Sequence, residues 1–184
     1  ASDFTAAWSS YLDLVRNSSF WRRLVFIEQP VHRGHTFEAP MPEILDGAGR
    51  AVPVIIDESD GRVGSLAEAL ALGYAGVSHK NCKGICKGAA NRCLVTSRAQ
   101  LSTGVRTLMT GEDLGSIGPV SMVQDLAVQA AFGISSVERN GHHYFAGLSQ
   151  LPHALQQQAL VHLPAMYHRS EEGWPALAIH EGMI

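Results

Sequence analysis

The sequence has little of what marks several specialised classes of protein. Its 184 residues include only three cysteines, Cys82, Cys86 and Cys93. An odd number of closely spaced cysteines argues against a disulfide framework, and the spacing fits no usual zinc site. We therefore expect these thiols to pack in the interior of a protein from a reducing compartment. No apolar run approaches the ~20 residues of a membrane-spanning helix, so we expect no membrane partner.

An excess of one charge is also missing. The chain has 14 lysines and arginines against 17 aspartates and glutamates, a formal net charge of −3. This balance gives no reason to expect nucleic acid or an anionic membrane as a partner. Polar residues interrupt the N-terminal segment, which shows no signal-peptide pattern, and this favours a cytoplasmic location. A G-x-G-x-x-G motif is absent, which counts against a dinucleotide-binding fold.

Apolar segments with the periodicity of strands and helices alternate along the chain. Hydrophobic residues make up 46% of the sequence, enough to bury a core. The expected strands are 24–28, 52–57, 74–80 and 105–110, and 135–145 is a polar strand or loop. The expected helices are 3–16, 36–46, 65–72, 84–100, 119–132 and 151–166, followed by an irregular tail. Repeated strand–helix units with few hairpin signals predict an α/β fold with a parallel sheet, which we interpret as one domain over residues 1–184.

Charged side chains stand where three of these strands end. LVFIEQP (24–30) runs into Glu28, VPVIIDES (52–59) runs into Asp57 and Glu58, and GVSHKNCKG (76–84) runs into Lys80. The carboxyl ends of parallel strands meet at one edge of a sheet, where α/β folds build their sites. Two carboxylates and a lysine at that edge suggest a metal ion with a neighbouring base.

The motifs FIEQP, IIDES and HKNCK, in this order, resemble three barrel strands of the enolase superfamily, specifically its mandelate racemase and muconate lactonizing enzyme group. The resemblance implies a modified (β/α) barrel of the TIM type that binds Mg²⁺, with Mn²⁺ as an alternative. Glu28 and Asp57 would bind the metal, and Lys80 would be the acid/base. Glu58 would support them by a hydrogen bond or serve as an alternative ligand. Lys83 is the site lysine instead if the strand ends a few residues later.

The length of the chain bears on how much of such a barrel it contains. A closed eight-fold barrel needs about 250 residues. The resemblance matches strands 4 to 8, so the N-terminal capping domain and the first barrel strands are expected to be absent. The chain is then the C-terminal portion of a longer, truncated or proteolysed enzyme. We expect it to associate with the missing N-terminal segment or with further copies of itself.

The resemblance also implies a reaction. It is the metal-dependent abstraction of a proton alpha to a carboxylate through an enediolate, by a racemase, epimerase, dehydratase or cycloisomerase of a small carboxylic acid. Lys80 would need a depressed pKa to accept that proton. At the seventh strand TGED stands where the family's racemases have a histidine, which favours lysine-based chemistry. The polar strand ends suggest a sugar acid or hydroxy acid as substrate. The candidate substrate contacts are Glu112, Asp113, Asn140, His142 and His143.

Simpler interpretations of the same residues remain open. A carboxylate at a strand end can cap the next helix or pair with a surface lysine, and Lys83 and Lys87 can form a solvated basic face. The whole chain can also be a catalytically inactive scaffold or assembly subunit, whose partial barrel would expose two strand edges. A third alternative is an unrelated α/β binding domain that uses no metal.

Overall fold

The computed structural model describes residues 2–49, 52–101, 106–113, 115–139, 141 and 144–183, with the side chains of 2–5 and 47–49 not described. The chain divides into two compact units, and the division falls between Thr110 and Gly111, inside a strand. Each unit is therefore described by itself.

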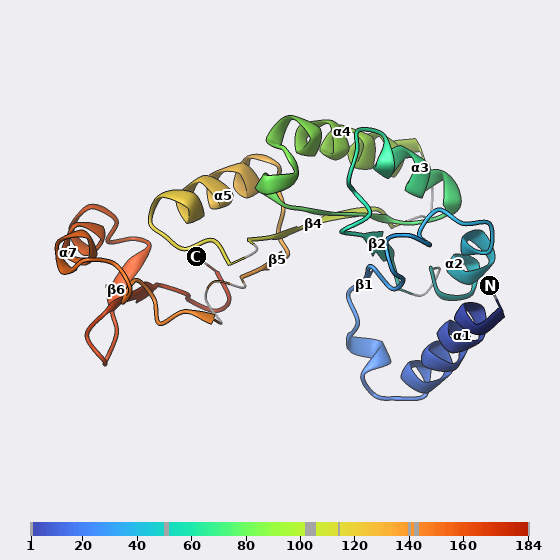
Figure 1. The fold of residues 1–184 in the computed structure, drawn as a ribbon, viewed down its shortest axis with the longest axis horizontal. Coiled ribbons are helices and arrows are strands. Elements are labelled where there is room, and N and C mark those ends of the chain that lie inside the picture. Colours follow the sequence, from blue (N-terminus) through green and yellow to red (C-terminus); the bar gives the residue numbers. More distant parts are fainter. Residues whose placement is uncertain are drawn as a thin grey trace. The chain divides into compact units, whose positions relative to one another are not determined.

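The first unit alternates helices and strands, as the sequence predicts (Figure 1). Its elements are α1 (Ser2–Arg16), a 3₁₀ turn (Trp21–Arg23), β1 (Ile27–Glu28), α2 (Met41–Gly49), β2 (Val54–Ile56), α3 (Ser65–Leu72), β3 (Gly76–His79), a 3₁₀ turn (Asn81–Lys83), α4 (Ile85–Leu101) and the start of β4 (Leu108–Glu112). Strand β1 pairs with β2 in parallel, and β2 pairs with β3 in parallel. Helices α3 and α4 both contact β3.

The second unit begins at the end of β4. Its elements are α5 (Val120–Ala131), β5 (Val137–Glu138), α7 (His153–His162), β6 (Tyr167–Arg169) and β7 (Pro175–Leu177). The last residues of β4 pair in parallel with β5. The sheet order is β1-β2-β3-β4-β5, so each strand lies beside the strand that follows it in the sequence. The chain therefore has an α/β fold with a five-stranded parallel sheet, in the order expected for part of a barrel wall.

Strands β2 and β3 form the centre of the first unit. Val54, Ile55, Ile56 and Val77 are at most 1% exposed. Burial of successive residues on both faces is typical of a parallel strand covered by helices, and the apolar runs predicted it. Gly76 permits close approach of β4, because a Cβ atom at this position would lie 1.7 Å from the carbonyl oxygen of Leu108. The Leu108 amide donates to the Ala75 carbonyl at 3.1 Å.

Helix α3 matches the sequence prediction, and Gly73 ends it with a φ of 107°. Other boundaries differ. The expected strand 24–28 is reduced to two residues, Ile27 and Glu28, which pair with Val54 and Ile55 of β2. The expected helix 36–46 begins only at Met41, after hydrogen-bonded turns in which the Met41 amide donates to the Glu38 carbonyl.

Two sequence predictions are wrong. The tail is not irregular, because β6 and β7 pair as an antiparallel hairpin with Tyr167 opposite Leu177. The three cysteines do not pack in the interior, since Cys82, Cys86 and Cys93 are all exposed. None of the described helices combines the length and the apolar character that crossing a membrane would require.

Candidate metal centre

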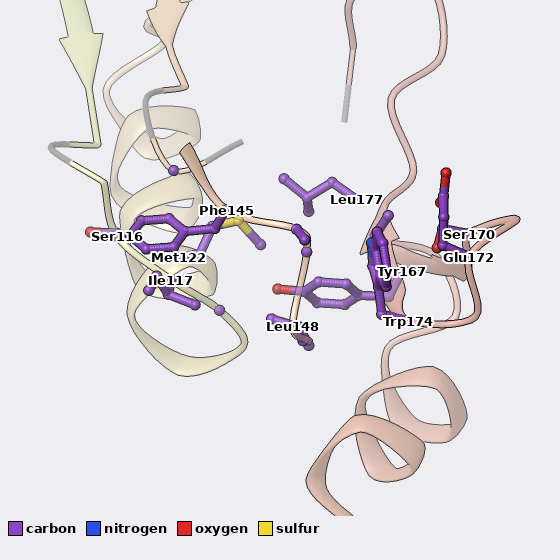
Figure 2. Close-up of a pocket in the computed structure, with 15 residues that line it drawn as sticks. Ser116, Ile117, Met122, Phe145, Leu148, Tyr167, Ser170, Glu172, Trp174 and Leu177 are labelled. Atoms are coloured by element: carbon purple, nitrogen blue, oxygen red, sulfur yellow. The ribbon is translucent and has the colours of Figure 1, made fainter. Parts of the chain in front are cut away.

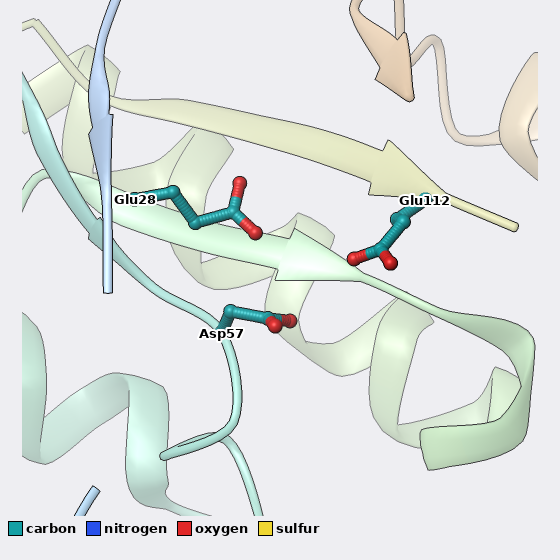
Figure 3. Close-up of side chains that lie close together, drawn as sticks. All are labelled: Glu28, Asp57 and Glu112. Carbon is teal, nitrogen blue, oxygen red and sulfur yellow. The ribbon is translucent and has the colours of Figure 1, made fainter. Parts of the chain in front are cut away.

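Carboxylates stand at the ends of three strands. Glu28 is the last residue of β1, Asp57 directly follows β2, and Glu112 is the last residue of β4. Figure 3 draws these side chains, and within the first unit a carboxylate oxygen of Glu28 lies within 4.8 Å of one of Asp57. The sequence pointed to Glu28 and Asp57 as metal ligands and to Glu112 only as a substrate contact. Carboxylates this close repel one another, so a nearby positive charge favours the arrangement.

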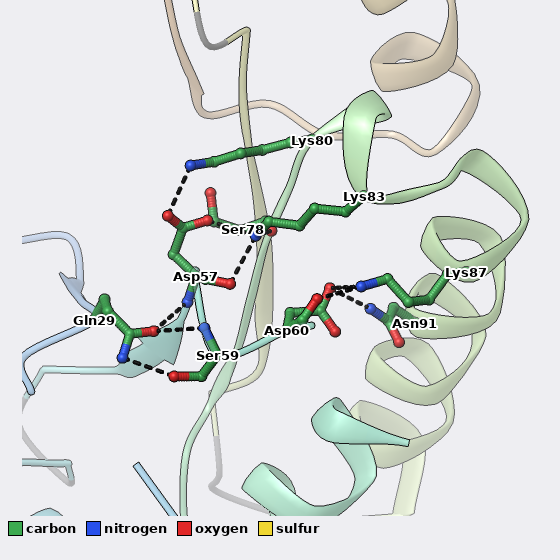
Figure 4. A network of polar contacts seen from close by, with 9 residues as sticks. All are labelled: Gln29, Asp57, Ser59, Asp60, Ser78, Lys80, Lys83, Lys87 and Asn91. Atoms are coloured by element: carbon green, nitrogen blue, oxygen red, sulfur yellow. Dashed lines mark hydrogen bonds and ion pairs between the residues drawn. The ribbon is translucent and has the colours of Figure 1, made fainter. Parts of the chain in front are cut away.

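Two lysines supply such charge and hold Asp57 from both sides. Lys80 Nζ lies 2.7 Å from Asp57 Oδ2, and Lys83 Nζ lies 2.6 Å from Asp57 Oδ1 (Figure 4). The side chain of Asp57 is 4% exposed, against 7% for Lys80 and 15% for Lys83. The turn over Asn81–Lys83 makes this possible, because residues three apart in a 3₁₀ turn lie on the same side. The two alternatives for the site lysine therefore contact the same carboxylate.

The two lysines also control the ionisation of Asp57. Burial raises the pKa of this carboxyl, but hydrogen bonds from Lys80 and Lys83, together with their charges, outweigh burial and lower the pKa below 3.8. Asp57 is therefore ionised at neutral pH. Lys83 has further acceptors, since its Nζ donates to the carbonyl oxygens of Asp57 at 2.7 Å and Ser78 at 3.1 Å.

The loop that carries Asp57 is fixed by Gln29, the residue after Glu28. Gln29 Oε1 accepts hydrogen bonds from the backbone amides of Asp57 at 2.9 Å and Ser59 at 3.3 Å. Its Nε2 donates to Ser59 Oγ at 2.9 Å and to Thr36 Oγ1 at 3.0 Å. Gln29 adopts a φ of 40°, an unfavourable backbone conformation for a residue with a side chain. Sequence reasoning missed this role, although Gln29 lies inside the FIEQP motif.

A second buried ion pair stands beside the first. Lys87 Nζ lies 2.9 Å from Asp60 Oδ2, and Asn91 Nδ2 donates to the same oxygen at 3.2 Å (Figure 4). The side chains of Lys87 and Asp60 are 11% and 3% exposed. The alternative in which Lys83 and Lys87 form a solvated basic face is therefore wrong.

The other predicted site residues lie elsewhere. Glu58 is exposed and does not belong to the carboxylates that lie close together, although both its neighbours in the sequence are buried. Asp113 is buried in the second unit, where it accepts from the Gly115 amide at 2.9 Å and pairs with Arg139 at 3.2 Å. These contacts give it a role in holding a loop. Asn140, His142 and His143 lie outside the described residues.

A pocket of about 340 Å³ lies against Glu28 in the first unit. Apart from Glu28, its lining is apolar or aromatic and comes from α1 and the β1 segment: Ala7, Trp8, Tyr11, Ile27 and Pro30. The rings of Trp8 and Tyr11 stack with their centroids 5.5 Å apart. A molecule that reached Glu28 through this pocket would meet aromatic faces.

Comparisons with known proteins give no relative on which to base a family assignment. No protein-family model matches the chain, and neither the curated proteins nor the solved structures searched include a match. The chemistry must therefore be argued from the residues themselves.

Proposed function

We propose that the chain takes part in the metal-dependent abstraction of a proton alpha to a carboxylate, the reaction that its resemblance to the enolase superfamily implies. The observation that supports this proposal is the proximity of the Glu28 and Asp57 carboxylates beside two lysines. Carboxylate oxygens are the ligands that Mg²⁺ and Mn²⁺ prefer.

The residues fit a divalent cation on ligand type. The carboxylates of Glu28 and Asp57 supply hard oxygen ligands, and Lys80 and Lys83 keep Asp57 ionised. A bound divalent cation would stabilise the negative charge that develops on the substrate's carboxylate oxygens. Glu28 and Asp57 would hold the cation.

The two lysines are suited to different tasks. Lys83 donates to three oxygens of Asp57 and Ser78, so we assign it to positioning Asp57. Lys80 reaches the same carboxylate from the opposite side, through Asp57 Oδ2. We assign the proton transfer to Lys80: after its ammonium group has lost a proton to solvent, the neutral amine would take the alpha proton, and the resulting ammonium would return a proton to the carbon or to a leaving group.

The pocket against Glu28 bears on the substrate. Its walls include Trp8, Tyr11 and Ile27, and such a surface favours a small carboxylic acid with an apolar or aromatic substituent. A sugar acid, which the polar strand ends suggested, would place most of its hydroxyl groups against these largely apolar walls. We therefore place aromatic and aliphatic acids ahead of sugar acids.

Metal binding is the first test. Titration calorimetry with Mn²⁺ should give one site on the parent chain, and Glu28→Gln and Asp57→Asn should each weaken it about 10- to 100-fold. Glu58→Gln is the matched control, because it removes an exposed carboxylate next to Asp57 and should bind like the parent. A parent chain that binds no Mn²⁺, or a control that loses as much as Asp57→Asn, would end the metal proposal.

Proton exchange is the second test. ¹H NMR in heavy water should show loss of the alpha-proton signal from at least one acid in a panel of aryl, alkyl, hydroxy and sugar acids. Lys80→Ala should abolish exchange and keep the metal. Metal binding without exchange from any acid would favour the inactive scaffold instead. In that case the two outer strands of the sheet, β1 and β5, are where another chain would pair.

A further inference from the structure

The second unit contains a pocket of its own, with a volume of about 220 Å³ (Figure 2). The start of α5, the segment before Leu148, and the β6–β7 hairpin line it. Most of the wall is apolar or aromatic, and its large side chains include Met122, Phe145, Leu148, Tyr167 and Trp174. A small concave site with aromatic walls is the usual form of a small-molecule pocket.

Two hydroxyl groups in this wall lack partners. Tyr167 is 3% exposed, and neither its hydroxyl nor the Ser170 Oγ has a hydrogen-bond partner among the residues that the structure describes. In Figure 2 the Tyr167 hydroxyl points into the space between Ile117 and Leu148. Buried polar groups are nearly always paired, so an unpaired hydroxyl at a pocket indicates that something else accepts its hydrogen bond.

A glycine leaves room for this hydroxyl. A Cβ atom at Gly118 would lie 1.7 Å from the Tyr167 hydroxyl oxygen. A side chain at Gly118 would therefore collide with the tyrosine in its present position. The glycine therefore leaves the space that the Tyr167 hydroxyl occupies in the pocket wall.

The charges around the pocket restrict what it can hold. Among the described lining residues there is no lysine, arginine or histidine, and the one carboxylate, Glu172, is exposed. Arg139, whose charge acts on Tyr167, is paired with Asp113, so no cation among the lining residues favours carboxylates or phosphates. The pocket is therefore unsuited to the acid that we propose as substrate.

We propose that this pocket binds a neutral, flat, mainly apolar molecule that carries a hydrogen-bond acceptor, such as an aryl ketone, ester or amide. The ring of the ligand packs against Phe145, Trp174 and Met122. The Tyr167 hydroxyl donates to the acceptor, and Ser170 is the second available donor. The proposal does not depend on the metal centre.

Two probes of similar shape test it. 4-Fluoroacetophenone carries a carbonyl acceptor and 4-fluoroethylbenzene does not, and ¹⁹F NMR titration in the presence of a chelator measures both affinities. Tyr167→Phe should weaken binding of the ketone about 5- to 20-fold and leave the hydrocarbon unchanged. Ala176→Leu, which fills space in the wall on β7, should weaken both.

The outcomes distinguish a pocket that binds a ligand from a cavity that only reflects imperfect packing. Because the Tyr167 hydroxyl has no described partner, Tyr167→Phe should fold as stably as the parent, as urea unfolding would show. The proposal is overturned if the parent binds neither probe at millimolar concentration, or if Tyr167→Phe weakens both probes equally. If Tyr167→Phe does not fold, the hydroxyl is structural and the proposal also fails. Ser170→Ala tests the second donor: if Ser170 donates to the ligand, this variant should weaken binding of the ketone and leave the hydrocarbon unchanged.

Discussion

Replacing Asp57 with asparagine should destabilise the chain by about 3–5 kcal/mol, the range expected when one partner is removed from a buried ion pair. The side chain of Asp57 is 4% exposed and carries the charge that faces Lys80 and Lys83. The substitution keeps the size of the side chain and removes the negative charge. Two largely buried ammonium groups then face a neutral amide.

The contacts of the two lysines set where in this range the loss should fall. Lys83 keeps the backbone carbonyls of residue 57 and Ser78 as acceptors, so its ammonium group remains hydrogen-bonded. The amide oxygen of asparagine can still accept one hydrogen bond. We therefore expect a value near the lower end, about 3 kcal/mol.

The assay is urea unfolding followed by circular dichroism, with a chelator present so that no metal contributes. Asp57→Asn should lower the midpoint without changing the slope. Glu58→Gln removes the neighbouring exposed carboxylate and should change the free energy of unfolding by less than about 0.5 kcal/mol.

A double-mutant cycle identifies the cause. Lys80→Met should cost less in the Asp57→Asn background than in the parent, with a coupling energy of about 1–3 kcal/mol. Additive losses would refute the reasoning, because they would mean that Lys80 and Asp57 stabilise the fold independently. A loss in Glu58→Gln as large as that in Asp57→Asn would refute it as well.

Four further predictions follow from other contacts. Because the pKa of Asp57 is lowered below 3.8, its contribution to stability is present above pH 3.8 and is lost as the pH falls further. The free energy of unfolding, measured at a series of pH values, should therefore fall less steeply below pH 3.8 in Asp57→Asn than in the parent. Gln29→Leu removes the hydrogen bonds to the Asp57 loop and should cost about 2–3 kcal/mol in urea unfolding, whereas a loss below about 0.5 kcal/mol would contradict that role. Lys80→Met should tighten Mn²⁺ binding about tenfold in calorimetry, since an ammonium group no longer competes for Asp57; weaker binding would argue that Lys80 supports the ion. Burial raises the pKa of Tyr167 to about 12 against the opposing charge of Arg139, so stability should fall as the pH rises from 10 towards 12, and ultraviolet titration should lose one late tyrosine step in Tyr167→Phe.

Local pattern predicted the central part of the fold well. The β-branched run Val54–Ile56 is buried on both faces, and helix α3 ends at Gly73 as its sequence indicates. The pattern failed where distant partners decide the conformation. Val25 belongs to an apolar run yet is 49% exposed, and the tail becomes a hairpin through the pairing of β6 with β7, in which Tyr167 lies opposite Leu177.

The candidate site was likewise predicted only in part from the sequence. Strand ends could be read from the sequence, and they placed Glu28, Asp57 and Lys80 correctly at the ends of β1, β2 and β3. The partners of those residues could not be predicted from the sequence, because side chains that meet across loops leave no periodic signal in it. The bridging amide of Gln29 and the buried pair of Asp60 with Lys87 are of this kind.

The exposure of Cys82 has a practical consequence. This thiol lies in the turn Asn81–Lys83, directly before one of the two lysines that hold Asp57, and it is accessible to a reagent. Cys86 and Cys93 are also exposed, so serine at both positions should leave the fold intact and one thiol available. A fluorophore or spin label on Cys82 would then report any rearrangement of that turn. The chain thus carries a native attachment point from which release of the lysines from Asp57 can be followed in real time.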